Sequence, residues 1–226
     1  QLVATGSRTQ ESAERFMKEH GGTAHGSYEA LIADPNIQAI YNSLPNSLHA
    51  SWSIAALQAG KHVLCEKPLA ASTAEVEAMF QAAALHERHL MEAFMYRHHP
   101  VVKEVLQQVH QGAIGDVKII RSHFTYQRPD HTEDIRYQPE LGGGGLLDIG
   151  CYCINFIRAI ANGEPCSMHI QAHSHETGVD DYAVGTLTFP NDILAVFTCG
   201  MVLQSDRTTT IAGSEGYLQI DIPWFS

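Results

Sequence analysis

The sequence predicts an α/β protein with two regions of different design: a doubly wound parallel sheet, followed by an α+β region whose open sheet is largely antiparallel. Over residues 1–95, short apolar runs alternate with amphipathic helical stretches, which is typical of parallel strands joined by crossover helices. Over residues 96–226, candidate strands follow one another across short turns, which favours antiparallel pairing. The two patterns predict two domains, residues 1–95 and residues 96–226.

Turn and capping residues predict where the elements of the first domain begin and end. Ser47 is a predicted N-cap, and Gly60 is expected to end the same helix. Ser72 and Glu75 have the spacing of a capping box for the next helix. The predicted strands are residues 2–5, 37–44, 62–65 and 89–93, and the predicted helices are residues 11–19, 48–59 and 73–86.

The second domain is predicted to open with a helix that starts at Pro100 and is closed by Gly112, because its apolar positions repeat every 3.6 residues. A long strand is expected next, and a helix follows a run of four glycines. Turn residues at 190–192 and 213–216 separate the later strands. The predicted strands are residues 117–126, 167–175, 182–189, 194–201, 207–212 and 217–220, and the predicted helix is residues 146–161.

Charge and composition narrow the class of protein. The chain has 226 residues and a formal net charge of −11, which repels phosphate backbones, so nucleic acid is not expected as a partner. No apolar run approaches the roughly 20 residues that cross a bilayer, and the start lacks the features of a signal peptide, so a cytoplasmic protein without membrane contact is expected. Five cysteines without framework spacing predict free thiols.

Lys67 is a candidate active-site residue because it follows a predicted strand and precedes Pro68. The residue before a proline favours an extended conformation, so Lys67 should leave the end of that strand without entering a helix. Ligands of open α/β sheets bind beyond the carboxyl ends of the strands. The alternative is an ordinary surface lysine in a loop.

Asp148 and Tyr152 form a second candidate pair, behind the four glycines at 142–145. On a helix, residues four apart share a face, so a carboxylate and a phenol there can orient and exchange protons with one hydroxyl. The alternatives are an acid that favours a helix N-terminus and a half-buried core tyrosine. The glycines could also cradle a phosphate, but they lack the Walker spacing and a following lysine.

Three blocks of sequence, in this order and spacing, resemble the signatures of the Gfo/Idh/MocA (glucose–fructose oxidoreductase-like) family. Two further segments resemble the branch that contains dimeric dihydrodiol dehydrogenase and NADP-dependent D-xylose dehydrogenase. The resemblance implies a Rossmann dinucleotide-binding domain, then a substrate-binding and dimerisation domain. The blocks are NSLPNSLH at 42–49, GKHVLCEKP at 60–68 and GGGLLDIGCY at 143–152, and the segments are MEAFMYR at 91–97 and HETGVDD at 175–181.

The resemblance places Lys67, Asp148 and Tyr152 at the family's catalytic positions and implies an NAD(P)-dependent dehydrogenase of CH–OH groups. Tyr152 would exchange the hydroxyl proton while hydride passes between the substrate carbon and the nicotinamide. Lys67 would favour the ionised phenol and bond the reacting oxygen, and Asp148 would orient the substrate or Lys67. Arg97 is a further candidate for substrate contact, with a surface ion pair as the alternative.

The cofactor is expected to be NADP rather than NAD. In dinucleotide folds, an acid at the end of the second strand binds the ribose 2′-hydroxyl, whereas arginine accommodates a 2′-phosphate. After the first predicted strand of this chain, Ser7 and Arg8 stand in a turn without an acid. The resemblance adds Asn46, His49, Glu66 and Lys67 to the cofactor-binding residues.

The family's G-x-G-x-x-G fingerprint does not occur in these residues. We therefore expect the chain to begin at the second strand of the fold and to stop within the second domain's sheet, which leaves open whether these residues alone bind the cofactor.

The leading hypothesis is an enzyme that oxidises an aldopyranose such as D-xylose, or a cyclic diol. The alternatives are a glucose–fructose oxidoreductase-like or inositol dehydrogenase-like enzyme, a non-catalytic dinucleotide-binding regulator, and an inactive product. An exposed sheet face predicts a homodimer or a higher homo-oligomer.

A metal site is not expected. His173 and His175 would share a face of a strand, as metal ligands can, but no cysteine or carboxylate stands at a recognised spacing. Phe124 and Tyr126 are predicted to pack on a sheet face rather than to form a platform for a sugar ring.

Overall fold

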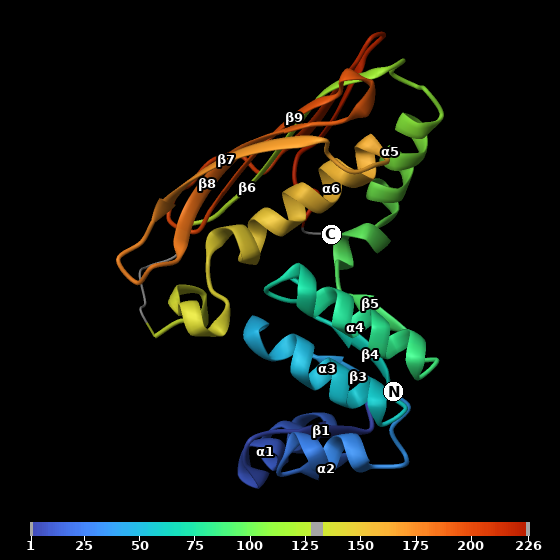
Figure 1. Cartoon of the computed structure of the whole chain (residues 1–226), viewed down its shortest axis with the longest axis vertical. Helices are drawn as coiled ribbons and strands as arrows, with labels where there is room; N and C mark the ends of the chain where they lie inside the picture. Colours follow the sequence, from blue (N-terminus) through green and yellow to red (C-terminus); the bar gives the residue numbers. More distant parts are fainter. Residues whose placement is uncertain (1, 128–132, 225–226) are drawn as a thin grey trace. The chain divides into compact units, whose positions relative to one another are not determined.

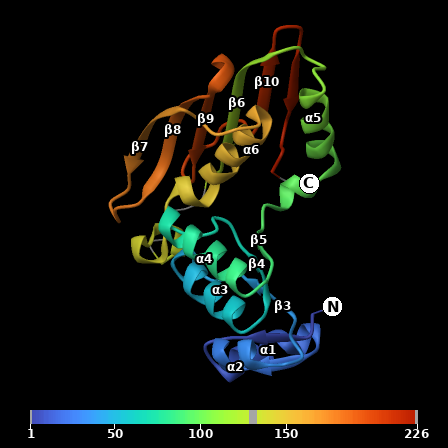
Figure 2. The same cartoon turned by 45° about the vertical axis from the view of Figure 1, so that its right-hand side comes forward.

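The computed structural model describes residues 2–127 and 133–224, and it folds into two compact units, Gln1–Ala93 and Phe94–Ser226 (Figure 1). Each unit has its own sheet and its own hydrophobic core. The N-terminal unit alternates short strands with helices, whereas the C-terminal unit contains one large sheet with a long helix on it (Figure 2). These architectures confirm the two fold classes that the sequence predicts.

The N-terminal unit holds five short strands, whose two sheets are parallel throughout. Leu57, Val63 and Met79 are buried in the core between the helices α3 and α4 and the three-stranded sheet β3-β4-β5. In order, the elements are β1 (Ala4–Gly6), α1 (Gln10–His20), β2 (Thr23–His25), α2 (Tyr28–Ala33), β3 (Ala39–Asn42), the 3-10 turn η1 (Asn46–Leu48), α3 (His49–Gln58), β4 (His62–Cys65), α4 (Thr73–Leu85) and β5 (Leu90–Glu92).

Capping side chains fix the starts of α1, α2 and α4, at Thr9, Ser27 and Ser72. The hydroxyl of Ser72 accepts a hydrogen bond from the backbone N–H of Glu75 at 3.3 Å, as the capping-box spacing predicts. The Glu75 carboxylate in turn accepts from the Ser72 hydroxyl and from the N–H of Ala71. The prediction that Ser47 is an N-cap is wrong. Ser47 lies inside η1, and α3 starts directly from that turn without a side-chain cap.

Two elements of this unit, β2 and α2, have no counterpart among the predicted ones. Strand β2 has three residues, none of them fully buried, and α2 has six residues, none of them fully buried. Periodic burial of apolar side chains is the main signal for a helix or a strand, so elements this short and exposed leave almost no pattern in the sequence.

The strands of the N-terminal unit form two separate sheets, β1-β2 and β3-β4-β5. In the common doubly wound order 3-2-1-4-5-6, a first strand lies between the second and the fourth. Suppose that β1, β2 and β3 correspond to the strands numbered 2, 3 and 4 in that order. The gap between the sheets β1-β2 and β3-β4-β5 then lies at the position of the strand numbered 1.

The C-terminal unit is built on a six-stranded sheet with the order β11-β10-β6-β9-β8-β7. Every neighbouring pair is antiparallel except β6 and β9, which run parallel, so the sheet is largely antiparallel as predicted. The strands are β6 (Val117–Thr125), β7 (Ser167–Ser174), β8 (Asp180–Thr188), β9 (Leu194–Gly200), β10 (Thr209–Gly213) and β11 (Tyr217–Ile220). The helical elements are η2 (Met95–His98), α5 (Pro100–His110), η3 (Ile135–Tyr137), η4 (Pro139–Leu141), η5 (Leu146–Gly150), α6 (Cys151–Ala161) and η6 (Pro190–Asp192).

Helix α6 lies on one face of this sheet and closes the core of the unit (Figure 2). Phe156 and Ile157 of α6 are buried in the same cluster as Ile120 and Phe197 of the sheet. The helix predicted for residues 146–161 is present, but its first five residues, η5, form a π-helical turn. All five cysteines are free, as predicted.

One segment, Pro139–Ala161, is long and apolar enough by length and composition to cross a membrane. Half of its most apolar stretch is buried inside the unit, and Gly142 and Gly144 break the helix with positive φ angles. The buried apolar side chains of this segment therefore belong to the core against the sheet. A core helix can meet the same criterion of length and composition.

Candidate active site

The carboxyl ends of β3, β4 and β5 are joined by hydrogen bonds around the loop that carries Lys67. The N–H of Glu66 donates to the carbonyl of Asn42 at 2.9 Å, and the N–H of Ala93 donates to the carbonyl of Cys65 at 2.8 Å. The N–H of Leu69 donates to the carboxylate of Glu92, also at 2.9 Å. Lys67 therefore stands at the end of β4, the edge where open α/β sheets bind ligands.

Glu66 ties the backbone of Lys67 to β3. One carboxylate oxygen accepts from the N–H of Lys67 at 3.2 Å, and the other accepts from the hydroxyl of Tyr41. Partial burial and the Glu66 carboxylate raise the pKa of Tyr41 to about 12, so this phenol stays neutral and donates. The peptide bond between Lys67 and Pro68 is cis, and the Lys67 side chain is half-buried.

His49, a predicted cofactor-binding residue, is completely buried at 0% exposure. Its Nδ1 lies 2.8 Å from the carbonyl oxygen of Pro68, and its Nε2 lies 2.7 Å from that of Leu44. Both partners are acceptors, so a ring nitrogen that carries a proton donates to the carbonyl that it faces. A buried ring bonded in this way braces the loop after β3 against the loop after β4.

Asn42 and Asn46 belong to the first of these loops. The buried side chain of Asn42 donates to the hydroxyl of Ser53 at 3.0 Å and accepts from the N–H of Leu44 at 3.2 Å. It thereby joins the end of β3 to α3. Asn46, a predicted cofactor contact, is half-buried at the start of the 3-10 turn that follows.

Ser7 and Arg8 follow the carboxyl end of β1. The N–H of Ser7 donates to the carbonyl of His25 at 3.1 Å, which fixes the start of this turn beside β2. Thr9 caps α1 by accepting from the N–H of Ser12, and the Arg8 side chain is exposed. A cation, two hydroxyls and a helix N-terminus gathered here form a donor set suited to a phosphate.

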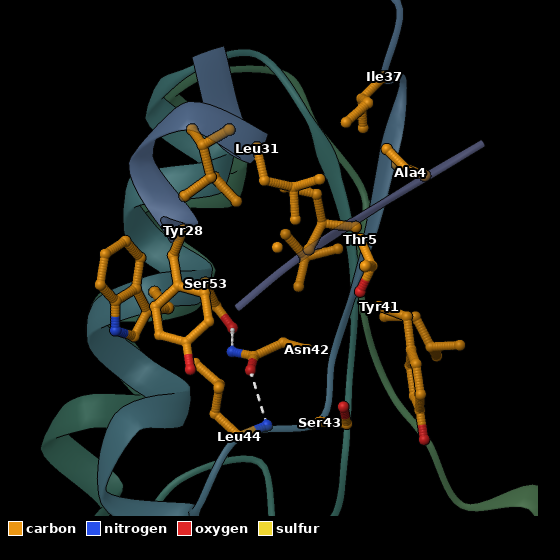
Figure 3. A pocket seen from close by; sticks show the side chains of 18 of the residues that line it. Ala4, Thr5, Tyr28, Leu31, Ile37, Tyr41, Asn42, Ser43, Leu44 and Ser53 are labelled. Atoms are coloured by element: carbon orange, nitrogen blue, oxygen red, sulfur yellow. Dashed lines mark hydrogen bonds between the residues drawn. The ribbon is translucent and has the colours of Figure 1, made fainter. Parts of the chain in front are cut away.

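A pocket of about 600 Å³ lies in the N-terminal unit between β1 and β3 (Figure 3). Its lining includes Ala4 and Thr5 of β1, Tyr41 and Asn42 of β3, and Tyr28 and Leu31 of α2. None of the predicted cofactor residues is among the residues that line it. Because its lining is mainly apolar and lacks these residues, the pocket does not mark the predicted cofactor site.

In the C-terminal unit, Asp148 belongs to a polar cluster that the sequence did not predict. The Tyr126 hydroxyl donates to its Oδ2 at 2.5 Å, and Nε of Arg136 donates to the same oxygen at 3.2 Å. Tyr126 comes from the end of β6 and Arg136 from η3, so three segments meet at this carboxylate. Tyr126 packs against the core as predicted, and its hydroxyl in addition bonds Asp148.

Tyr152 lies in an aromatic cluster and is 6% exposed. Its ring centroid lies 5.3 Å from that of Phe94, 5.4 Å from that of Phe124 and 5.8 Å from that of Trp224. Its hydroxyl donates to the sulfur of Met95 at 3.5 Å, and a thioether is a weak acceptor. Asp148 and Tyr152 thus have different immediate surroundings, one polar and one aromatic.

Three of the four glycines, Gly143 to Gly145, pack closely against other segments. A Cβ on Gly143 would stand 2.5 Å from the carbonyl oxygen of Arg136, and one on Gly144 would stand 2.4 Å from Oδ1 of Asp180. Asp180 also accepts from the N–H of Leu146 at 2.6 Å and so caps η5. Burial raises the pKa of Asp180 above its usual value. The glycines are therefore needed for close packing at the helix start.

The remaining candidates have simpler surroundings. Arg97 lies in η2 with an exposed side chain. His173 pairs with Asp181 at 2.8 Å, a carboxylate partner that the spacing did not reveal, and His175 bonds Thr177. Over residues 2–127 and 133–224, no group of three or more His, Cys, Asp or Glu side chains could hold a metal ion.

Comparison with known proteins identifies the family. Residues 1–94 match the oxidoreductase family with an NAD-binding Rossmann fold, GFO/IDH/MocA, and residues 102–219 match the GFO/IDH/MocA C-terminal domain. The chain is 40% identical over 222 residues to trans-1,2-dihydrobenzene-1,2-diol dehydrogenase from Xenopus laevis, a match that covers 97% of this chain and 67% of the relative. It is 39% identical over 196 residues to D-xylose 1-dehydrogenase (NADP(+)) 2 from Haloferax volcanii, covering 86% of this chain and 60% of that enzyme.

A solved structure supports the same assignment. A variant of a 3-ketoreductase from Actinomadura kijaniata, crystallised with TDP-benzene and NADP, matches with a TM-score of 0.90 and 33% identity. The match covers 99% of this chain and 69% of the ketoreductase. This chain therefore belongs to the GFO/IDH/MocA family of oxidoreductases.

Proposed function

We propose that this protein is an NADP-dependent dehydrogenase that oxidises an aldopyranose such as D-xylose at C1, or a related cyclic diol. The observation that carries the proposal is the 40% identity, over 222 residues, to a dehydrogenase of a cyclic diol. A xylose dehydrogenase named for NADP is almost as similar, at 39%. The chain spans about two thirds of the length of the diol dehydrogenase, so the activity is proposed for the whole protein to which these residues belong.

In this proposal, the three predicted catalytic residues divide the work. Lys67 bonds the reacting oxygen and stabilises negative charge on it, and Tyr152 exchanges the hydroxyl proton. Asp148 accepts hydrogen bonds from substrate hydroxyls and so orients the ring. NADP, when bound, supplies the hydride acceptor. Support for these roles comes from the family resemblance and from the position of Lys67 at the carboxyl end of β4.

The residues after β1 fit NADP better than NAD. The exposed Arg8, the Ser7 hydroxyl and the N-terminus of α1 can hold a 2′-phosphate, and residues 6–9 contain no carboxylate to accept from a 2′-hydroxyl. Ser7→Asp should therefore reduce the preference for NADP over NAD by about tenfold, roughly 1.4 kcal/mol. The ratio of kcat/KM for the two cofactors measures it, and an unchanged ratio contradicts the assignment of this turn.

The function is tested by following NADPH absorbance with pentoses, hexoses and cyclic diols as substrates. Turnover with one of these classes supports the proposal and names the substrate. Tight binding of NADP without turnover on any of them favours a dinucleotide-binding regulator. Oxidation of one sugar coupled to reduction of another, on a retained cofactor, favours a glucose–fructose oxidoreductase-like enzyme. Turnover confined to inositols favours an inositol dehydrogenase.

We also propose a cytoplasmic homodimer, formed through the face of the six-stranded sheet that α6 leaves uncovered. Tyr182 and Val184 of β8 and Leu194 of β9 are exposed, and they alternate along their strands with residues buried in the core. Exposed apolar sheet faces are common at interfaces. Sedimentation of the whole protein tests the assembly, and a monomer at micromolar concentration contradicts it. Fractionation of the source cells tests the location.

A further inference from the structure

The structure shows how the carboxylate of Asp148 is held. Two donors from different segments, the Tyr126 hydroxyl and Nε of Arg136, both bond to Oδ2, at 2.5 Å and 3.2 Å. Only 13% of the Asp148 side chain is exposed, so water screens these bonds weakly. Two hydrogen bonds to the same oxygen restrict the orientation of the carboxylate and favour its ionised form, because donors bond a charged oxygen more strongly than the oxygen of a neutral carboxyl group.

Arg136 is itself held at both ends. Its Nη1 pairs with Oδ1 of Asp134 at 3.2 Å, and the N–H of Gly144 donates to its backbone carbonyl at 2.9 Å. Burial alone would lower the pKa of Arg136, but the negative charge of Asp148 and further contributions from Tyr126 and Asp134 raise it. The guanidinium therefore stays charged, and it lies between two carboxylates.

Two thiols also lie near Asp148. Burial and then the Asp180 carboxylate raise the pKa of Cys199 on β9 to about 12, with a smaller contribution from Asp148, so this thiol stays neutral. The Cys151 thiol bonds the backbone carbonyls of Leu147 and Asp148. Arg136 is thus a cation that the structure places directly on the Asp148 carboxylate.

We propose that Arg136 and Tyr126 are positioning residues of the dehydrogenase. By bonding one of the two carboxylate oxygens of Asp148, they keep this carboxylate ionised and oriented toward the substrate. This proposal rests on the proposed function, in which Asp148 orients the substrate. A carboxylate kept ionised accepts hydrogen bonds from hydroxyl groups and does not donate. An acceptor of this kind suits the hydroxyl groups of an uncharged polyol.

Kinetics of matched variants test the positioning role. Arg136→Met should lower kcat/KM for the polyol by about 10- to 100-fold, because a misplaced orienting group costs rate, while the Kd for NADP stays within about twofold. Added guanidinium should restore part of this activity, and Arg136→Lys should retain more than Arg136→Met. Tyr126→Phe should lower kcat/KM by about three- to tenfold. Arg158→Met is the control, because Arg158 also pairs with a carboxylate, Glu164, but at the exposed end of α6.

A second measurement does not depend on activity. Carbon-13 NMR of the aspartate carboxyls in the whole protein follows the pH at which Asp148 takes up a proton. In Arg136→Met, this midpoint should rise by about one pH unit, whereas in Arg158→Met it should not change.

The two readouts separate the possible failures. An unchanged midpoint in Arg136→Met, or a kcat/KM within twofold of the parent protein, overturns the proposal. A raised midpoint in a protein that turns over none of the sugars and diols confirms the hold on Asp148 and contradicts the proposed function.

Discussion

The two units of this chain hold their candidate site residues by different means. In the N-terminal unit, buried side chains bond to backbone groups: His49 spans the carbonyls of Leu44 and Pro68, and Lys61 bonds the carbonyls of Asp34 and Ile37. In the C-terminal unit, Asp148 is held by the side chains of Tyr126 and Arg136. The hydrogen bonds in the N-terminal unit fix the positions of loops, whereas those in the C-terminal unit fix the orientation of a single carboxylate.

The difference has a consequence for substitutions. Removing a buried side chain that bonds backbone carbonyls leaves those carbonyls without a partner, which lowers the stability of the unit. Removing Arg136, whose side chain is 34% exposed, leaves the Tyr126 hydroxyl on the Asp148 carboxylate, so the orientation and charge of that carboxylate should change more than the stability does. Substitutions that support the N-terminal loops should therefore act on folding, and those around Asp148 should act on activity.

Substitution of Lys67 should have the largest effect. Unlike the side chains that support the N-terminal loops, Lys67 should affect activity rather than folding. Lys67→Met should lower kcat by about 10²- to 10⁴-fold, the range typical of groups that act directly on proton transfer. The free energy of unfolding should change by less than about 0.5 kcal/mol, because Lys67 lies in a half-buried loop. Steady-state kinetics and urea unfolding measure the two quantities. A near-normal kcat would remove Lys67 from the catalytic residues.

Lys61 is the matched control for Lys67, since it is another lysine at the opposite end of β4. Its side chain is only 7% exposed, and its ammonium lies 2.7 Å from each of two carbonyl oxygens. Lys61→Met should lower the free energy of unfolding by about 3 kcal/mol, because hydrogen bonds to a charged group contribute about 1.5–3 kcal/mol each. The folded fraction should keep its kcat. Urea unfolding decides it: a loss under about 0.5 kcal/mol contradicts the bracing role.

His49 should give a graded effect. His49→Leu removes both hydrogen bonds and should lower the free energy of unfolding by about 2 kcal/mol, whereas His49→Gln keeps one donor and should lower it by about 1 kcal/mol. Thermal and urea unfolding measure the series, with the exposed His20→Gln as the control. Equal losses for the two His49 variants would show that the volume of the ring, rather than its hydrogen bonds, supports the loops.

Glu164 should give the smallest effect. Its hydrogen bond from Arg158, at 2.8 Å, lowers its pKa below the usual 4.5, although the pair is exposed. Because the pKa is lower in the folded protein, the stabilisation is present above the unfolded pKa and is lost as pH falls through the folded pKa. Glu164→Gln should therefore lower the free energy of unfolding by less than about 0.5 kcal/mol at pH 7 and leave it unchanged in acid. Urea unfolding at pH 7 measures the loss. A larger loss would show that an exposed ion pair contributes more to the stability of this protein than we expect.

Elements with strong local signals could be predicted from the sequence. Strand β4, His62–Cys65, has the predicted bounds. Its residues alternate in burial, and it is followed by a loop that Pro68 prevents from becoming helical. The start of α4 follows from Ser72 and Glu75, and the start of α5 from Pro100. The short elements β2 and α2 have no such signals. The π turn at Leu146–Gly150 also escaped prediction, because its cause lies in Asp180 and the backbone packed against the glycines.

The candidate site shows the same division. Lys67, Asp148 and Tyr152 could be found because they stand in short motifs of the family, and Ser7 and Arg8 because they follow a strand. Arg136 and Tyr126 could not be found, since each contacts Asp148 only after a β-strand, a 3-10 turn and a helix start come together. His49 was found for its motif, but its complete burial and its two carbonyl partners are properties of the folded unit.

The sequence by itself determined the family, the order of the elements and the residue types that carry the proposed chemistry, because these are written in local periodicity and in short ordered motifs. The tertiary structure decided which groups surround each of those residues: the carbonyls on His49, the aromatic rings around Tyr152, and the cation and phenol on Asp148. Charge, orientation and burial depend on neighbours that are distant along the chain, and only the packing of the elements brings those neighbours within hydrogen-bond distance.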